Sequence, residues 1–581
     1  MIRIKDHKQQ QLFDPWDFLS PKRRLMLEQG WPGLFREHLL DELPVDQVIP
    51  HFKDGFGRPT KELHTVLGVL LLQQTMDLND EQTVHQLSFN IQWHYALNIT
   101  EESDEAKYIS EKTLWSMRRL MVEHNLDEVM FERLTDKLAK VFDVDTTNQR
   151  IDSVHIRSNM RQLGRITIFS RTISKFLVNL KRHHRHLFDQ VDSGLIDRYG
   201  DKKSLAAFSL VKPTESEKTL KVVSADLFDL IEQFKDQPSV CSMHSYKLME
   251  RVLADQCHLE TDDLGAGKVE VKKASEIKAN SLQNPSDPDA TYSGHKGQGY
   301  QVQIMETYSR DKDEFEKEPA LNLITHVEVQ AACQSDAQAL VPAIVDTRLR
   351  GLGPDELVAD TLYGSDENHR IAEAAHVKLV APTRKGSETR PLSAFKFDDE
   401  GYVTFCPAGH QPKQHQLTGK GTVIAVFDLD GCQACQRLPY CPVKLGKRDA
   451  RLHYNDKQYR LAVRRAAEQS ESFTETYRWR AGVEAAMSEY DRLTGVKKLR
   501  VRGRGAVRFC AKMKATGLNL LRAARVMLAR VRTGAANSGL KRRFCTMFQL
   551  IVWGEYAPKA DFSYLLVKRD CVAANRYKMA A

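Results

Sequence analysis

Apolar positions recur at helical spacing through the first 140 residues of the chain. One predicted helix face is lined by Leu63, Val66, Leu67, Leu70 and Leu71. Asp80 precedes a second helical stretch, and Ser110 is placed to cap a third, because a serine oxygen accepts hydrogen bonds from free N–H groups at a helix start. We expect residues 1–140 to form an all-helical N-terminal domain, either a helix-turn-helix DNA reader or a plain helix bundle.

The pattern changes after about residue 141 to short stretches typical of strands. Apolar and polar residues alternate over residues 150–156, as in a half-buried strand, and this stretch contains Asp152. Residues 357–359 form a short apolar run of the kind found in a buried parallel strand, and Asp360 follows directly. Two carboxylates therefore accompany two predicted strands.

A third carboxylate lies on a predicted helix. Tyr477, Arg480 and Glu484 are spaced i, i+3 and i+7, so their side chains share one helix face. Hard oxygen ligands from separate elements suit Mg²⁺, which keeps several waters and leaves room for a substrate phosphate. Two such ions about 4 Å apart can activate an attacking oxygen and stabilise a leaving one. Taken singly, such carboxylates are ordinary turn, cap or solvated residues, so the predicted site depends on all three.

Charge is distributed unevenly along the chain, although the net charge is only +8. No Asp or Glu occurs from Arg492 to Gly554, and sixteen Lys and Arg residues fall between Arg492 and Arg543. A second acid-free stretch, from Ser153 to Phe188, holds eight Lys and Arg residues. A basic surface beside a metal site suits a polyanion such as DNA. The alternative is a solvated basic helix face.

Length and composition indicate a large protein of several domains. The chain has 581 residues, well above the ~100–200 of one domain. No run reaches the ~18 apolar residues of a membrane span, and the N-terminus lacks a signal-peptide pattern. Ten cysteines in a chain without an export signal favour reduced thiols. We expect a cytoplasmic protein with no membrane association.

Four of the ten cysteines lie close together in the sequence. The spacing Cys406, Cys432-x2-Cys435 and Cys441, among Gly and Pro residues, is typical of a structural zinc site, with His410 as a competing ligand. Four thiolates would complete a tetrahedron around Zn²⁺. The alternative is a set of incidental free cysteines.

Three segments resemble the catalytic blocks of DDE transposases from bacterial insertion sequences. They are IDSVHIRSNMRQLGRI around Asp152, LVADTLYGSDEN around Asp360, and YRWRAGVEAAMSEYDRLTGVKKLRVRG around Glu484. The third block is similar to the branch that reads Tyr, two residues, Arg, three residues, Glu. FGRPTKELHTVLGVLLLQQTMDLNDEQTVHQLSFNIQWHYAL resembles the helical N-terminal domain of these enzymes. The family places a lysine seven residues after the Glu, where this chain has Asp491, so Lys497 or Lys498 is the candidate replacement.

The resemblance implies an α/β fold with an RNase H-like catalytic core, a mixed sheet against which the Glu484 helix lies. It divides the chain into a DNA-binding domain (1–140), a first core part (141–395) with a helical insertion (about 190–280), and later segments. These are a cysteine-rich, zinc-ribbon-like insertion (396–450), a second core part (451–535) and a C-terminal extension (536–581). The protein is expected in the bacterial cytoplasm, associated with the nucleoid.

The family also implies roles for single residues. Asp152, Asp360 and Glu484 would hold two Mg²⁺ or Mn²⁺ ions. Double-stranded DNA, as inverted-repeat ends and as target, would be bound by a homodimer. The predicted DNA contacts are Tyr477, Arg480, Lys497, Lys498, Arg500, Arg502, Arg504, Arg508 and Lys512. Two other function classes stay open at this point: an RNase H-like nuclease that never joins strands, and a non-catalytic DNA-binding protein derived from a transposase.

Overall fold

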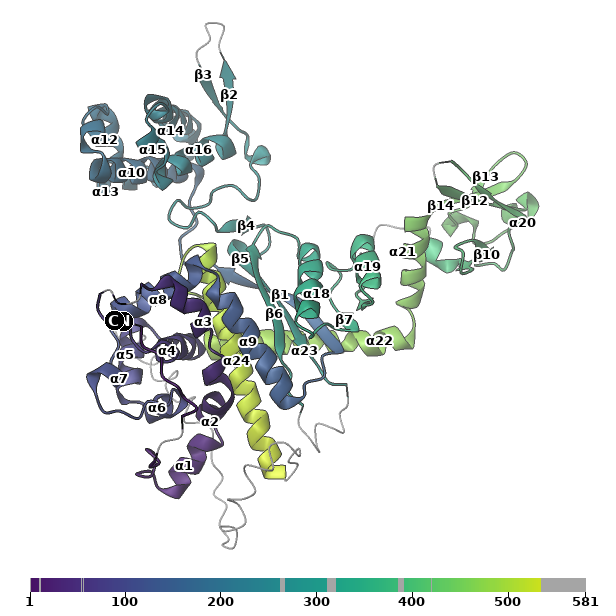
Figure 1. Ribbon diagram of the computed structural model, residues 1–581. Coiled ribbons are helices and arrows are strands. Elements are labelled where there is room, and N and C mark those ends of the chain that lie inside the picture. The colour runs from purple at the N-terminus through teal and green to yellow at the C-terminus, as the bar shows by residue number, and fades with distance from the viewer. Residues whose placement is uncertain are drawn as a thin grey trace, which may run out of the picture. The chain divides into compact units, whose positions relative to one another are not determined.

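The computed structural model in Figure 1 describes most of the chain. The described residues are 2–9, 12–53, 55, 57–261, 267–310, 320–384, 391–419 and 421–533. The predicted C-terminal extension, 536–581, lies outside the described residues. Within the described ranges, no helix is both long enough and apolar enough to span a membrane.

A mixed sheet of six strands carries two of the predicted catalytic positions (Figure 1). Its strands are β1 (Asn148–Arg157), β4 (Thr291–Ser293), β5 (Gly297–Thr307), β6 (Ile324–Ala331), β7 (Glu356–Val358) and β8 (Lys378–Val380). β5 pairs antiparallel with β1, β4 and β6, whereas β7 is parallel to both β1 and β8. The order β6, β5, β1, β7, β8 is consistent with the predicted RNase H-like core.

Apolar side chains cover both faces of this sheet. On one face, Val154 joins a large cluster that includes residues of the N-terminal helices. On the other face, Ile151 and Leu357 pack with α18 (Leu340–Leu349) and α19 (Asp366–Ala374). Burial on both faces explains why Leu357 belongs to a continuous apolar run rather than to an alternating one.

The N-terminal region is helical, as predicted. Its helices are α1 (Pro21–Glu28), α2 (Trp31–Leu34), α3 (Val45–Val48), α4 (Leu63–Thr75), α5 (Asp80–Phe89), α6 (Ile91–Ala96), α7 (Asp104–Lys107), α8 (Glu111–Glu123) and α9 (Leu126–Phe142). The prediction for Ser110 is confirmed, because its side chain accepts a hydrogen bond from the Thr113 N–H at the start of α8. Asn79 caps α5 in the same way, through the N–H of Gln82.

The N-terminal helices share one hydrophobic core with the sheet and with α24 (Arg504–Thr533). Leu67 of α4, Val154 of β1 and Leu518 of α24 belong to the same buried cluster. Gly517 lets α24 approach Thr75 closely, since a Cβ at this position would collide with the threonine side chain. Helices from the two ends of the described chain therefore pack together with the six-stranded sheet.

A second core lies in the helical segment that follows β1. Its elements are α10 (Arg165–His183), α11 (Arg185–Phe188), α12 (Ser193–Tyr199), α13 (Lys202–Ala207), α14 (Pro213–Phe234), α15 (Pro238–Cys241), α16 (His244–Gln256), β2 (Cys257–Thr261) and β3 (Gly267–Val271). Phe176 lies between Phe234 and Tyr246, which joins α10, α14 and α16 through aromatic contacts. The helices begin at Arg165, before the predicted position of about 190.

The cysteine-containing segment forms a small β structure with its own core. Its elements are β9 (Lys396–Phe397), β10 (Val403–Phe405), β11 (Gln414–Leu417), β12 (Thr422–Phe427), α20 (Leu429–Gln433), β13 (Lys444–Leu445) and β14 (Ala450–Asn455). The chain then continues into α21 (Asp456–Ala467).

A pair of ion pairs connects α21 with α19. Asp366 lies 2.8 Å from Arg460 and 2.7 Å from Arg464, measured between oxygen and nitrogen. These arginine hydrogen bonds lower the pKa of Asp366 to about 2, against the opposing effect of burial. Asp366 does not cap α19, because Ser365 is the cap and its side chain accepts from the Asn368 N–H.

Candidate active site

Asp152 and Asp360 lie close to the paired ends of two adjacent parallel strands. The pairing of β1 with β7 ends with Arg150 opposite Val358. Asp152 follows two residues later on β1, and Asp360 comes two residues after the end of β7, near enough for its charge to raise the pKa of Asp152. Neighbouring strands are about 4.8 Å apart, so the two backbones are close enough for both carboxylates to serve one site. The Asp360 carboxylate also accepts a hydrogen bond from the Leu362 N–H at 2.8 Å, the turn role that its position at a strand end suggests.

The Arg480 guanidinium joins Asp152 to Glu484. One nitrogen lies 3.0 Å from an Asp152 oxygen and another lies 3.0 Å from a Glu484 oxygen. The predicted continuous helix is interrupted here: α22 (Glu471–Tyr477) ends before a short 3₁₀ turn (Arg478–Arg480), and α23 (Ala481–Thr494) follows. The break places Tyr477, Arg480 and Glu484 in three successive elements. Arg480 contacts Asp152 of the sheet directly, and Glu484 contacts the same guanidinium.

The turn that carries Arg480 is held against the sheet by its neighbour Trp479. The Arg150 side chain donates a hydrogen bond of 2.9 Å to the Trp479 carbonyl. The Trp479 ring stacks on Tyr308, with 5.7 Å between ring centroids. Gly482 is required for this arrangement, because a Cβ there would collide with the Arg150 guanidinium.

Arg150 is itself fixed by a buried charge network. It pairs with Glu306, its cross-strand neighbour in β5, at 2.7 Å, and Glu306 is fully buried. Arg522 of α24 pairs with the second Glu306 oxygen at 2.9 Å and with Glu489 of α23 at 2.9 Å. The network therefore connects the sheet, α23 and α24 directly behind the Arg480 turn.

The electrostatics of Asp152 differ from those of an ordinary paired aspartate. Burial raises the pKa of Asp152, and the neighbouring charges of Asp360 and Asp336 raise it further, while the Ser153 N–H and Arg480 oppose the rise. For Arg480, burial opposes the charge, but Asp152, Glu484 and other neighbours raise its pKa overall. The site therefore contains more negative charge than its one arginine neutralises.

Two residues of this site were missed by the sequence analysis. Asp336 is buried and accepts hydrogen bonds from Gln301 and, at 2.8 Å, from Gln303. Tyr363 is fully buried and donates to the Gln303 side-chain oxygen at 2.5 Å, and burial together with the nearby carboxylates raises its pKa well above the usual value. Gln301 and Gln303, alternating polar positions in a buried strand, were the available signal.

The three predicted carboxylates fit divalent-metal chemistry by their donor atoms. They are hard oxygen donors, with Asp152 and Asp360 partly buried and Glu484 exposed over 68 % of its side chain. In the described part of the chain, the carboxylate oxygens of these three residues do not all lie within 4.8 Å of one another. A two-ion site does not need that spacing, because carboxylates at its ends contact different ions.

The predicted DNA contacts of the basic stretch divide into two groups. Lys497, Lys498, Arg500, Arg502 and Arg504 are exposed. Arg508 and Lys512 instead contact α9, pairing with Asp127 and Glu128 at 2.8 Å each, and only 6 % of the Lys512 side chain is exposed. Figure 1 shows α24 running beside α9.

Arg508 and Lys512, two of the predicted DNA contacts, therefore do not lie on an open basic face. Helical periodicity located a buried stripe, but α24 is covered on further sides. Arg522 is buried between Glu306 and Glu489. Exposed Arg504 also donates to the Val329 carbonyl.

Asp287 and Asp289, two aspartates before β4, have a structural role. Asp287 accepts hydrogen bonds from Ser158, Tyr300 and the Gly503 N–H. Asp289 accepts from the Arg504 N–H at 2.9 Å. These carboxylates satisfy N–H groups at the start of α24, where negative charge is stabilised by the helix dipole.

The family lysine has no counterpart at Asp491. The Asp491 carboxylate accepts from the Lys497 backbone N–H at 3.1 Å, and the Lys497 carbonyl accepts from the Arg157 N–H at the end of β1. The turn after α23 therefore brings Lys497 beside the same strand that carries Asp152. Its side chain is exposed.

The cysteine segment brings its thiols near one another without closing a site. Burial raises the pKa of Cys432 to about 11, and the thiols of Cys406, Cys441 and Cys435 contribute to the rise. The His410 N–H lies 3.3 Å from the Cys406 sulfur. Of the described residues, no three of these cysteines meet the 4.8 Å ligand spacing, so a zinc site is not shown.

A search among curated proteins found no match. Residues 34–120 match the family model described as Transposase domain (DUF772), and residues 405–524 match the model described as Transposase DDE domain. The second match contains Arg480 and Glu484, and the first contains most of the N-terminal helices. These two stretches of the chain are therefore similar to transposase domains, the DDE domain among them.

Proposed function

We propose that this protein is a DDE transposase that binds the inverted repeats at the ends of its own element, cleaves the DNA there and joins the freed 3′ ends to target DNA. The observation that carries the proposal is the Arg480 contact with both Asp152 and Glu484, with Asp360 near enough for its charge to act on Asp152. An excess of carboxylates in a half-open site is the arrangement that divalent cations and phosphates complete.

The residues have distinct roles in this proposal. Asp152, Asp360 and Glu484 hold two Mg²⁺ or Mn²⁺ ions, which when bound activate the attacking oxygen and stabilise the leaving 3′ oxygen. Arg480 exchanges its carboxylate contacts for a DNA phosphate, which its planar guanidinium binds well. Tyr477, packed next to Trp479 on the sheet, positions the same strand.

DNA is held by the exposed basic residues after α23. Lys497, Lys498, Arg500, Arg502 and Arg504 contact the backbone and set register without reading sequence. The N-terminal helices read the inverted repeats, and two chains assemble on paired ends. Cys406, Cys432, Cys435 and Cys441 bind one structural Zn²⁺ when the ion draws the thiolates together, with His410 as a competing ligand.

A cleavage assay tests the catalytic proposal. The substrate is a duplex that carries the imperfect inverted repeats expected in the DNA beside the gene. Asp152→Asn, Asp360→Asn and Glu484→Gln should each lower cleavage by at least about 10³-fold, an order of 4 kcal/mol in barrier, because an amide lacks the charge that the ions require. Binding of the same DNA should persist.

Asp355→Asn is the matched control, since Asp355 is an exposed aspartate at the opposite end of β7. It should cleave at the wild-type rate. A carboxylate variant that also cleaves at the wild-type rate would remove that residue from the site.

A strand-transfer assay separates the two enzyme classes, because the first chemical step is the same for both. Joined product identifies a transposase, whereas cleavage without joining identifies an RNase H-like nuclease. Absence of both, with DNA binding retained, would leave the non-catalytic DNA-binding protein.

A further inference from the structure

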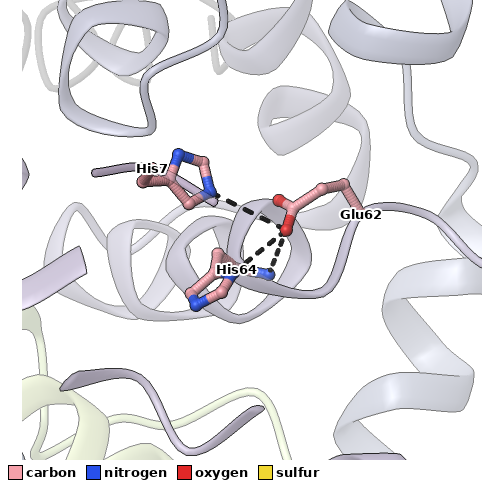
Figure 2. Close-up of side chains that lie close together, drawn as sticks. All are labelled: His7, Glu62 and His64. Carbon is pink, nitrogen blue, oxygen red and sulfur yellow. Dashed lines mark hydrogen bonds and ion pairs between the residues drawn. The ribbon is translucent and has the colours of Figure 1, made fainter. Parts of the chain in front are cut away.

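Residues 2–9, here called the N-terminal arm, contain a histidine whose ring nitrogens have no hydrogen-bond partner. The His7 side chain is only 3 % exposed, and both of its ring nitrogens are buried without a hydrogen bond. Buried polar groups are normally paired, so an unpaired imidazole calls for a ligand or ion that completes it. Glu62 and His64, at the start of α4, lie close to His7 (Figure 2).

The three side chains converge on one carboxylate oxygen. Glu62 Oε1 lies 3.0 Å from His64 Nδ1 and 3.7 Å from His7 Nε2. The rings of His7 and His64 meet edge to face, 4.8 Å between centroids. Figure 2 shows both imidazoles directed at the Glu62 carboxylate.

We propose that His7, Glu62 and His64 form a binding site for a transition-metal ion, with Zn²⁺ as the preferred occupant. Among the described residues, these three form the group in which one ligand atom from each lies within 4.8 Å of the others. Tetrahedral zinc with bonds of about 2.0–2.1 Å places its ligand atoms about 3.3 Å apart, close to the two distances from Glu62 Oε1. Imidazole with carboxylate suits zinc and neighbouring first-row ions better than Mg²⁺.

The second Glu62 oxygen explains why the carboxylate is already in place. Oε2 accepts from the Thr65 N–H at 2.6 Å and from the Thr65 hydroxyl at 2.7 Å, so it caps α4. Oε1 is turned to the histidines, although it also accepts from the His64 N–H at 3.1 Å. A ligand oriented by other hydrogen bonds is typical of metal sites.

Occupation of the site would fasten the N-terminal arm to α4. The arm already runs beside the residues before α4: the Arg3 N–H donates to Thr60, and the Leu63 N–H donates to the Arg3 carbonyl. An ion held by His7 on the arm and by Glu62 and His64 on the helix would make that attachment depend on metal. The three protein ligands leave a fourth position for water.

Metal analysis of the full chain tests the proposal against the separate zinc site of the cysteine segment. In a Cys432→Ser, Cys435→Ser background, any remaining zinc cannot come from the cysteine site. This background should retain about one zinc per chain after dialysis. Adding His7→Gln and His64→Gln should remove it, whereas His85→Gln, at an exposed histidine outside the group, should not.

Cobalt substitution gives an independent readout. Co²⁺ in the cysteine-deficient background should show ligand-field bands without thiolate charge transfer, because its ligands are nitrogen and oxygen. Chelation should also speed proteolytic clipping of the arm, while helical circular dichroism stays unchanged. A zinc-free cysteine-deficient protein with intact His7, Glu62 and His64 would overturn the proposal, as would zinc that persists in the double histidine variant.

Discussion

The charged groups around Arg150 and around Asp152, two residues of the same strand, differ in how completely their charges are neutralised. Arg150 and Asp152 are two residues apart on β1 and therefore lie on one face of the sheet. Around Arg150, buried Glu306 has an arginine on each oxygen, and Glu489 completes the network. Around Asp152, the carboxylates of Asp360 and Asp336 oppose ionisation, and one arginine serves both Asp152 and Glu484.

The difference separates a structural role from a functional one. In a closed network, such as that around Arg150, every charge is paired within the protein, so none is left for a ligand to neutralise. Breaking such a network lowers the free energy of unfolding. A site with excess negative charge favours cation binding, because the bound ion relieves the repulsion between its carboxylates. The two groups are also mechanically connected, since Arg150 holds the Trp479 carbonyl next to Arg480.

The largest effect should come from breaking the closed network. Glu306→Gln leaves two buried guanidinium groups without their shared carboxylate, and loss of one partner from a buried pair costs on the order of 3–5 kcal/mol. Denaturant unfolding should show this as a lower midpoint. Glu373→Gln, at an exposed position of α19, should stay within about 0.5 kcal/mol of the wild type. Equal midpoints for both variants would contradict the structural role of the network.

A smaller effect should come from disturbing the connection between the two groups. Gly482→Ala would improve helix propensity by about 1 kcal/mol in an open helix, but here the new Cβ collides with the Arg150 guanidinium. The displaced turn should lower the cleavage rate by about tenfold, equivalent to about 1.4 kcal/mol. Ala485→Gly, at an exposed position of the same helix, should reduce stability and leave the rate unchanged. A faster or unchanged Gly482→Ala enzyme would show that Arg480 does not depend on this contact.

The smallest effect concerns Asp152 in metal-free protein. Its raised pKa means that the folded state holds this proton more firmly than the unfolded chain. Stability should therefore fall as the pH rises from the ordinary aspartate pKa of about 3.9 through the raised value. Asp152→Asn has no charge to bury, so at neutral pH thermal unfolding should show it to be more stable than the wild type.

Asp366 provides the opposite case, and thermal unfolding measured across pH can test both aspartates. Its pKa is lowered to about 2 by Arg460 and Arg464, so its contribution is present above the unfolded pKa and is lost as the pH falls through about 2. Asp366→Asn should be destabilised at neutral pH. If Asp152→Asn is destabilised to the same extent, the carboxylate site is not under-neutralised.

The sequence by itself determined the local elements of this protein. Periodicity located the N-terminal helices, the β1 and β7 strands and the Ser110 cap, because these depend on neighbours within a few residues. It also singled out Asp152, Asp360 and Glu484, and the structure brings the first two near one another, each two residues beyond the last paired position of β1 and β7. Whether the three carboxylates act as one catalytic site stays a prediction.

Only the tertiary structure decided where each charged side chain finds its partner. Arg508, Lys512 and Arg522 look like an open basic face in the sequence, yet their acceptors are Asp127, Glu128 and Glu306, hundreds of residues away along the chain. Arg150, Asp336 and His7 gave no local signal for the same reason. Ion pairs and ligand groups form between residues that are close in space, and helical or strand periodicity carries no information on which distant element will lie against a given face.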